Sequence, residues 1–454
     1  MDKVKDLTKG KISSVIGKLA TPLIGASFLQ MAYSMTDMIW LGKLGSAPVA
    51  AVGACFFFVW MGNAIAYTPK VGTEVCVSQS IGAGNKESAS KYAANALSFS
   101  NLIGFIYILF LIAAAPLLLR IFHLEDSISQ MGVEYLRLVT PGVFASCFIL
   151  TSSAIYYGTG NSKTPFYFIA IGLGINIILD PLLIFGFGPI KAMGSNGAAI
   201  ATSLTQIGVV TLFASRLYSK NSPVGRIFFF TAFERKRLSK IVKLGLPVSL
   251  QSAIFSCISM TLASFASSFG HIGVAAQSVG SQIEAVSWMT ASGFSTALSS
   301  FVGQNYGAGL FKRIKHGYFI TLGMAGSIGF TAGLIFILFP ETIFKIFISE
   351  PDALEQGAIY LRILGCSQLA MVVEMVTTGA FNGVGKTKIP AFIGVFFTAL
   401  RIPGAYILMN TSMMLAGIWW AVSISSIFKG LVNFGWFGFG VIRKFPSKEV
   451  KLKI

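Results

Sequence analysis

The chain carries one short segment twice, as QSIGAG at residues 79–84 and as QNYGAG at residues 304–309. The two copies lie 225 residues apart (304 minus 79), and other features keep the same offset. Pro22 matches Pro247, Tyr135 matches Tyr360, and the turn at residues 158–165 matches residues 383–390. Because one shared offset does not arise easily by chance in diverged apolar sequence, the chain is a duplication of one unit.

The composition is that of a membrane protein. It is 54% hydrophobic and 11% charged, with a mean hydropathy of +0.73. Its apolar stretches run for about 20 residues, the length of a helix that crosses a bilayer. Breaks between these stretches predict twelve helices, centred near Phe28, Val59, Tyr107, Phe144, Leu173, Val209, Ser256, Met289, Ile328, Met371, Phe397 and Ile427.

Six of the twelve helices fall in each half. We therefore expect an all-α integral membrane protein with twelve transmembrane helices in two parallel six-helix bundles, related by a pseudo-two-fold axis along the membrane normal. The N-lobe would comprise residues 1–222 with helices 1–6, and the C-lobe residues 223–454 with helices 7–12.

The net charge of +18 reflects membrane topology rather than nucleic-acid binding. Most of the 35 Lys and Arg fall at the two ends of the chain or in loops that share one side of the membrane. The opposite loops hold only Lys43, Arg120, Lys191 and Lys345. This positive-inside bias predicts a multi-pass protein of the cell membrane with both termini cytoplasmic.

The sequence gives little support for an enzyme. The five Cys lie singly in apolar stretches and the three His lie far apart, without the spacing of a metal or nucleophile motif. We expect no catalytic residue, no cofactor and no resident metal.

A few polar residues lie within the predicted spans, and three of them form the candidate site. These are Asp37 on helix 1 and Asn176 and Asp180 on helix 5. A carboxylate in the middle of a membrane helix costs about 2.5–3.5 kcal/mol on insertion scales, so it needs a function or a partner. Asn176 and Asp180 are four residues apart and share one helix face.

The duplication supports a functional role for this cluster. The positions at the 225-residue offset are different, since the second half has Leu262, Arg401 and Ala405 there. A packing requirement would recur in both halves. The structural alternative is that Asp37 caps a kink and that Asp180 forms a hydrogen bond within its own lobe.

The second half carries charges of its own within the spans: Glu284, Glu374, Arg401 and Lys429. Two acids and two bases could neutralise one another as ion pairs, or they could bind substrate. Lys70 and Glu74 on helix 2 are four residues apart, which predicts an intrahelical pair that could belong to an inner gate.

Aromatic and methionine side chains favour a cavity for flat, apolar cations. Ordinary apolar packing is the alternative for each of them. The candidates for the substrate cavity are Tyr33, Met31, Met35, Phe57, Trp60, Met260, Glu284 and Trp288.

Along its whole length the chain resembles the multidrug and toxic compound extrusion (MATE) transporters. The resemblance is carried by residues 22–45, by residues 78–84 with their copy at 303–309, by the turn at 158–165, and by Asn176, Asp180 and Pro181. It implies an antiporter that exchanges cationic amphipathic drugs for protons or sodium. It also implies a cation-coupling site formed by Asp37, Asn176, Asp180, Tyr135 and Thr202.

One departure from the family pattern concerns helix 7. The sodium-coupled branch has a Glu there, whereas this chain has no acidic residue between Ile241 and Phe269. A second-lobe cation site of that kind is therefore not expected.

The mechanism that we expect is alternating access driven by protons. Burial and mutual repulsion favour a protonated form of the Asp37 and Asp180 pair, and loss of that proton restores a site for an organic cation. Sodium held by Asp37, Asn176, Asp180 and Thr202 is the alternative. The expected partners are small organic cations and the lipid bilayer, with no nucleic acid, and the expected state is a monomer.

A lipid-linked precursor flippase is the alternative function. Such a protein would be expected to have a basic cavity and additional helices, so the acidic cluster and the count of twelve favour the antiporter.

Overall fold

A computed structural model describes residues 4–122, 124–220, 222–228, 231, 233–348 and 350–446. The regular structure of these residues is helical, apart from one isolated bridge between Phe187 and Ile190. Residues 1–3 and 447–454 lie outside the described residues, so the predicted cytoplasmic location of the two ends stays a prediction.

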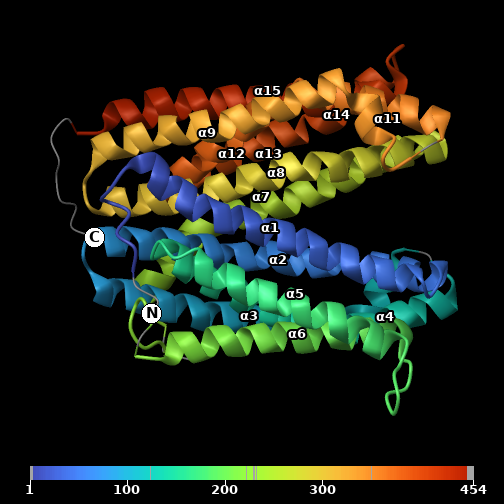
Figure 1. Cartoon of the computed structure of the whole chain (residues 1–454), viewed down its shortest axis with the longest axis horizontal. Helices are drawn as coiled ribbons and strands as arrows, with labels where there is room; N and C mark the ends of the chain where they lie inside the picture. Colours follow the sequence, from blue (N-terminus) through green and yellow to red (C-terminus); the bar gives the residue numbers. More distant parts are fainter. Residues whose placement is uncertain are drawn as a thin grey trace. The chain divides into compact units, whose positions relative to one another are not determined.

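The first half of the chain forms six long helices (Figure 1). They are α1 (Ile12–Gly42), α2 (Ser46–Gly82), α3 (Lys86–Arg120), α4 (Asp126–Gly158), α5 (Lys163–Ile184) and α6 (Gly194–Tyr218). Each of the first six predicted centres lies inside one of these helices.

The second half has the same order with more interruptions. Its elements are α7 (Arg235–Ser267), α8 (Gly270–Gly307), α9 (Phe311–Leu338), α10 (Pro340–Phe344), α11 (Pro351–Gly365), α12 (Gln368–Gly383), α13 (Lys388–Ala399), α14 (Arg401–Met409), α15 (Met414–Gly435), a π-helical turn η1 (Trp436–Val441) and a 3-10 turn η2 (Ile442–Lys444). The remaining six centres fall within α7, α8, α9, α12, α13 and α15.

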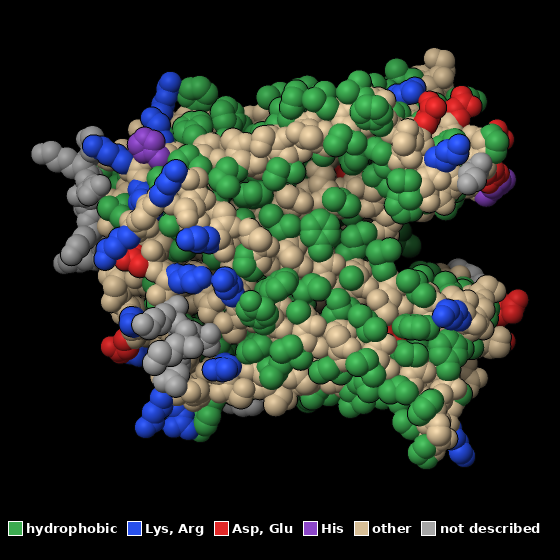
Figure 2. All heavy atoms as spheres, viewed as in Figure 1, with side chains coloured by type: hydrophobic (Ala, Val, Ile, Leu, Met, Phe, Trp, Pro, Cys, Tyr) green, Lys and Arg blue, Asp and Glu red, His purple; other side chains and the backbone are tan. Residues whose placement is uncertain are grey.

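Ten spans in the described part of the chain are long and apolar enough to cross a membrane, and the pair α11–α12, bent by 50°, makes eleven. α13 and α14 count as one of the ten. The twelfth predicted span is α8, which has 38 residues but carries several polar side chains, Glu284 among them. Large apolar side chains such as Phe105, Ile106 and Phe110 of α3 are exposed, as expected where lipid is the solvent. Figure 2 shows hydrophobic side chains along the helices and Lys and Arg gathered near helix ends.

The duplication read from the sequence recurs in the helix boundaries. α4 spans residues 126–158, and α11 with α12 spans residues 351–383, a shift of 225 at both ends (351 minus 126, 383 minus 158). α5 spans residues 163–184 and α13 with α14 spans residues 388–409, with the same shift (388 minus 163, 409 minus 184).

The repeated segment, at residues 79–84 and 304–309, forms the same helix end twice. Gly84 and Gly309 both have φ near 76°, in the left-handed region that favours glycine. The amide of Asn85 donates to the Ser80 carbonyl at 2.9 Å, and the amide of Leu310 donates to the Asn305 carbonyl at 2.8 Å. The glycine that ends the motif is therefore required by the backbone in each copy.

The two halves differ in how they interrupt their helices. α5 continues through Pro181 to Ile184, whereas its counterpart breaks at Leu400 between α13 and α14. Pro403 has no N–H to donate to the carbonyl of Ala399, which accounts for a break at this position.

Contacts divide the chain into two compact units. Unit 1 comprises residues 1–6 and 25–249, and unit 2 comprises residues 7–24 and 250–454. In unit 1, α4 packs against α2, α3 and α6, and α5 packs against α6. In unit 2, α12 packs against α8, α9 and α15, and α14 packs against α15. These units follow packing rather than chain order, so the lobe boundary predicted at residue 222 stays a prediction.

Candidate ion-coupling site

The candidate site lies in unit 1, where α1 and α5 bring three polar side chains together. The side-chain amide of Asn176 donates to Asp180 Oδ1 at 2.9 Å, and both residues are fully buried. The carboxyl group of Asp37 lies next to that of Asp180. The structure therefore brings together the three residues that the sequence singled out.

Local packing explains why these side chains face the same place. Asn176 and Asp180 are one helical turn apart on α5, so their side chains point to the same side. Gly197 of α6 lies against the backbone of Leu183, where a Cβ would leave no room. This close approach of α5 and α6 brings Thr202 of α6 toward the cluster.

Two tyrosines and two further polar side chains surround the carboxyl groups. Tyr135 of α4 is buried and lies near enough to Asp37, Asp180 and Tyr33 to interact with them electrostatically. Tyr33 of α1 lies in turn next to Thr202 and Gln206 of α6. The five residues of the predicted coupling site thus share one neighbourhood, and their role in coupling stays a prediction. Gln206 was not among the sequence candidates, because a lone Gln on an apolar helix carries no distinctive pattern.

Several oxygens of this cluster lack a hydrogen-bond partner within the described part of the chain. They are Asp37 Oδ1, Asn176 Oδ1, Asp180 Oδ2 and Thr202 Oγ1. The ion pairs formed by described residues also include neither Asp37 nor Asp180. Since buried polar atoms are normally satisfied, oxygens in this arrangement suit a proton, a cation or water.

The residues predicted to line a substrate cavity lie in both units. Met31, Tyr33, Met35, Phe57 and Trp60 belong to unit 1, and Met260, Glu284 and Trp288 belong to unit 2. Met35, Trp60, Met260 and Trp288 are exposed, while Phe57 is half-buried and packs edge-on against Phe58 at 5.5 Å between ring centroids. Their contact with a substrate stays a prediction.

The predicted Lys70–Glu74 pair also stays a prediction. The Lys70 ammonium lies over the Tyr67 ring, 4.8 Å from its centroid. Glu74 is buried and lies near Tyr157.

The charges of the second half form a polar cluster inside unit 2. Lys429 and Glu374 form an ion pair with 3.2 Å between Nζ and Oε2. Arg401 donates instead to the hydroxyl oxygens of Ser425 and Ser426, at 2.6 and 2.9 Å. One acid and one base of the second half thus form an ion pair, whereas Arg401 contacts neutral groups, and the choice between pairing and substrate binding for these residues stays a prediction.

Glu284 is also held by neutral groups. It accepts hydrogen bonds from the Tyr360 hydroxyl and the Gln368 amide, each at 3.3 Å. The sequence reasoning did not single out Tyr360, Gln368, Ser425 or Ser426 as site residues. Tyr360 could have been found, because it lies at the repeat offset from Tyr135.

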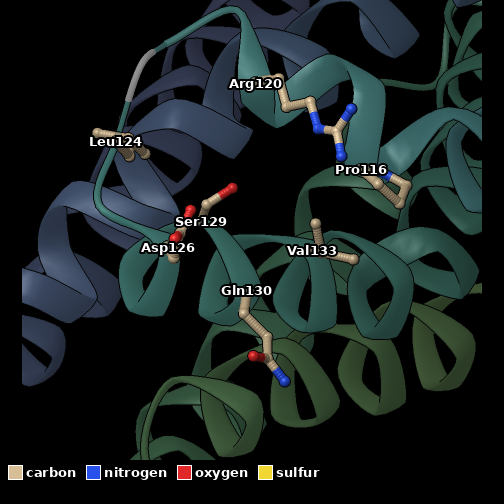
Figure 3. Close-up of a pocket in the computed structure, with 7 residues that line it drawn as sticks. All are labelled: Pro116, Arg120, Leu124, Asp126, Ser129, Gln130 and Val133. Atoms are coloured by element: carbon tan, nitrogen blue, oxygen red, sulfur yellow. The ribbon is translucent and has the colours of Figure 1, made fainter.

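A hollow of about 370 Å³ opens at the surface of unit 1 (Figure 3). Pro116 and Arg120 of α3 line one side, and residues of α4 and of the loop before it line the other. Its lining is Pro116, Arg120, Leu124, Asp126, Ser129, Gln130 and Val133. It contains none of the predicted site residues.

Comparison with known families assigns the chain to one of them. The MatE family model matches the sequence twice, over residues 22–182 and 247–407. The two matches cover more than half of the chain, and they begin 225 residues apart (247 minus 22), at the repeat offset. The chain belongs to the MatE family. This MatE chain therefore has the twelve-helix, two-bundle fold expected from its sequence.

Curated relatives of this MatE protein match it over most of their length. A probable multidrug resistance protein NorM of Thermotoga maritima is 27% identical over 429 residues, covering 92% of this chain and 90% of the relative. An FAD transporter of Shewanella oneidensis is 25% identical over 385 residues, covering 83% of each protein.

Solved structures of the family are similar over nearly the whole length. An outward-facing multidrug resistance MATE transporter of the MOP superfamily has a TM-score of 0.89 at 27% identity, covering 98% of this chain and 100% of that one. A MOP superfamily transporter from Pyrococcus furiosus, described as having a binding pocket of reverse polarity, has a TM-score of 0.89 at 27% identity, covering 97% and 99%. This MatE protein is accordingly a multi-pass membrane protein.

Proposed function

We propose that this MatE protein is a secondary antiporter that exports cationic amphipathic molecules in exchange for protons. The observation that carries the proposal is the pair of adjacent carboxyl groups, Asp37 and Asp180, held with Asn176 inside a membrane bundle. No basic side chain forms an ion pair with either carboxyl group among the described residues. A permanently charged pair would be costly there, so a reversible charge is favoured.

Proton binding and cation binding exclude one another at such a site. Two neighbouring carboxylates repel, and one proton shared between them relieves the repulsion. The protonated site has little attraction for a cation, whereas the deprotonated site attracts one. If the two forms favour opposite orientations of the bundles, competition between proton and substrate yields exchange.

The substrate class rests on relatives and on composition. Several relatives are named as multidrug resistance proteins, which supports small organic molecules as substrates. Exposed aromatic and methionine side chains, such as Trp60 and Met35, provide faces to which flat cations bind. We propose the cell membrane as the location, with both termini cytoplasmic, a monomeric state and no cofactor.

The test is transport by proteoliposomes that contain the purified protein, a pH gradient or a sodium gradient, and ethidium as the substrate. We expect the pH gradient alone to drive ethidium efflux, and Asp37→Asn and Asp180→Asn each to abolish this efflux. Glu355→Gln, which changes an exposed carboxylate of α11, is the matched control and should transport normally.

Two outcomes would contradict the proton proposal. Efflux driven by sodium alone would make sodium the coupling ion, bound by the oxygens of Asp37, Asn176, Asp180 and Thr202. Efflux that persists in either Asp variant would remove the carboxyl pair from the mechanism. Size-exclusion profiles of the variants verify that they fold.

A further inference from the structure

Unit 2 contains a polar cluster whose members correspond in part to the coupling site of unit 1. Arg401 occupies the repeat position of Asn176 (401 minus 176 is 225), and Tyr360 occupies that of Tyr135. Where unit 1 has an amide beside two carboxyl groups, unit 2 therefore has a guanidinium. The duplication has placed side chains of different charge at equivalent points of the two bundles.

The backbone and two serines fix the position of Arg401. It is the first residue of α14, directly after the break at Leu400. Its Nε donates to Ser425 Oγ at 2.6 Å and its Nη2 donates to Ser426 Oγ at 2.9 Å, both from α15. A guanidinium has five N–H groups, so these two bonds leave donors available.

The two carboxylates of this cluster have partners other than Arg401. Glu374 pairs with Lys429, and Glu284 accepts from Tyr360 and Gln368. Across the described ranges no acidic side chain lies within ion-pair distance of Arg401. Glu374 and Glu284 act on the guanidinium only from beyond that distance, so its hydrogen bonds go to the two serine hydroxyls and its remaining N–H groups have no carboxylate acceptor among the described residues. Its planar fork fits a carboxylate through two parallel hydrogen bonds.

An apolar rim lies next to this guanidinium. The Phe255 ring of α7 is 6.0 Å from the Arg401 guanidinium carbon, and Phe255 and Leu400 are both exposed. Arg401 itself is 94% buried, since 6% of its surface is accessible. A molecule with an aromatic body and an acidic group would find both an apolar contact and a charged partner here.

We propose that Arg401, held by Ser425 and Ser426, is a carboxylate-binding subsite. The ligand is the carboxylate of an amphipathic zwitterion, so that this protein accepts molecules carrying both a cationic centre and an acid. The inference rests on the proposed function as an exporter, but it concerns recognition and is tested by binding.

The experiment compares two dyes that differ in one group. Rhodamine B carries a free carboxylate, and in its ethyl ester this group is blocked while the cationic ring system is unchanged. Fluorescence anisotropy measures the affinity of the purified full-length protein for each dye. We expect Arg401→Gln to weaken binding of the free acid about tenfold or more, as for loss of a charge-assisted hydrogen bond, and binding of the ester less than about twofold.

Arg362→Gln provides the matched control. Arg362 also lies in unit 2, but it is exposed and pairs with Glu341 at 3.2 Å. This variant should bind both dyes as the unaltered protein does. Arg401→Lys should restore part of the affinity for the free acid, because a charge remains but the fork is lost.

Several results would contradict the carboxylate subsite. If Arg401→Gln weakens the binding of both dyes equally, the role of Arg401 is structural. If the free acid binds the variant with unchanged affinity, or does not bind the unaltered protein, the subsite is excluded. Affinities for acid and ester that depend equally on chloride would assign the site to a free anion and also overturn the proposal. Failure of ethidium transport with these binding results intact would instead contradict the proposed function alone.

Discussion

Lys429 and Glu374 illustrate how single residues decide the stability of unit 2. Their ion pair is 3.2 Å long, and both side chains are almost inaccessible. Removing one partner of a buried pair leaves an uncompensated charge, which typically costs about 3–5 kcal/mol. Replacing both partners by apolar groups avoids that cost.

We therefore expect Lys429→Met to lower thermal stability strongly and Lys429→Met with Glu374→Met to recover most of it. The measurement is the midpoint of thermal unfolding in detergent for both single variants and the double variant. As a control, Lys91→Met breaks the exposed 2.6 Å pair with Glu87 and should change the midpoint little. Additive losses in the double variant would mean that the pair is not coupled.

At the scale of helices, close approach depends on glycine. A Cβ on Gly245 of α7 would overlap the backbone of Thr68 in α2, and a Cβ on Gly72 of α2 would overlap the backbone of Ile241. Small residues at such contacts let two membrane helices pack backbone to backbone. The contact belongs to unit 1 and joins helices that are far apart in sequence.

Gly245→Ala should consequently lower the free energy of unfolding by roughly 1–3 kcal/mol, since the backbones must separate. Gly208→Ala on α6 is the control, because no atom lies within 4 Å of the place that its Cβ would take. That change should leave stability unchanged or raise it slightly, as alanine favours a helix over glycine. Unfolding of both variants in a denaturant series checks the difference. Similar stability of both would show that the α2–α7 contact tolerates separation.

Helix positions were predictable, whereas helix breaks were only partly so. Apolar stretches and the breaks between them located all twelve centres, because a bilayer imposes a minimum length on every span. Pro403 explains the break at Leu400, but a proline alone does not predict a break, because α5 continues through Pro181. The 50° bend between α11 and α12 falls at Cys366 and Ser367, directly after Gly365, but the chain has 48 Gly, so a single glycine does not mark a bend. Packing against neighbours decides such cases, and a single sequence does not contain it.

The candidate site shows the same division. Asp37, Asn176 and Asp180 were identifiable because ionisable groups are rare in membrane spans and because Asn176 lies one helical turn from Asp180. The hydrogen bonds from Arg401 to Ser425 and Ser426 could not be predicted. Serines are frequent in these helices, and their partners depend on the direction of each side chain. The repeat offset marked Tyr360 but did not specify its contact with Glu284.

At the scale of the whole molecule, charge placement sets topology. Lys315 lies at the start of α9 and Lys191 lies in the loop before α6, and both are exposed. The positive-inside bias puts residue 315 in the cytoplasm and residue 191 outside. The family fold fixes the number of spans, so the location of either residue tests the orientation predicted for the whole chain.

Single cysteines should distinguish the two sides. In a background with Cys257 and Cys366, the exposed native cysteines, replaced by serine, we expect Lys191→Cys to react with a membrane-impermeant maleimide on intact cells. Lys315→Cys should react only after the membrane is permeabilised. Labelling in the reverse order would invert the proposed orientation, and with it the direction of transport.

The prolines of α5 and α14 have a consequence for how this protein is dissected. Pro181 and Pro403 leave the main-chain oxygens of Ile177 and Ala399 without the amide four residues further on. Each of these oxygens is a neighbour, along its own helix, of a buried polar side chain. An oxygen of the main chain survives every side-chain replacement, so a scan of alanine variants would undercount the hydrogen-bond acceptors near the two polar clusters. Backbone ester substitution at these two peptide units would reveal the contribution of these main-chain oxygens.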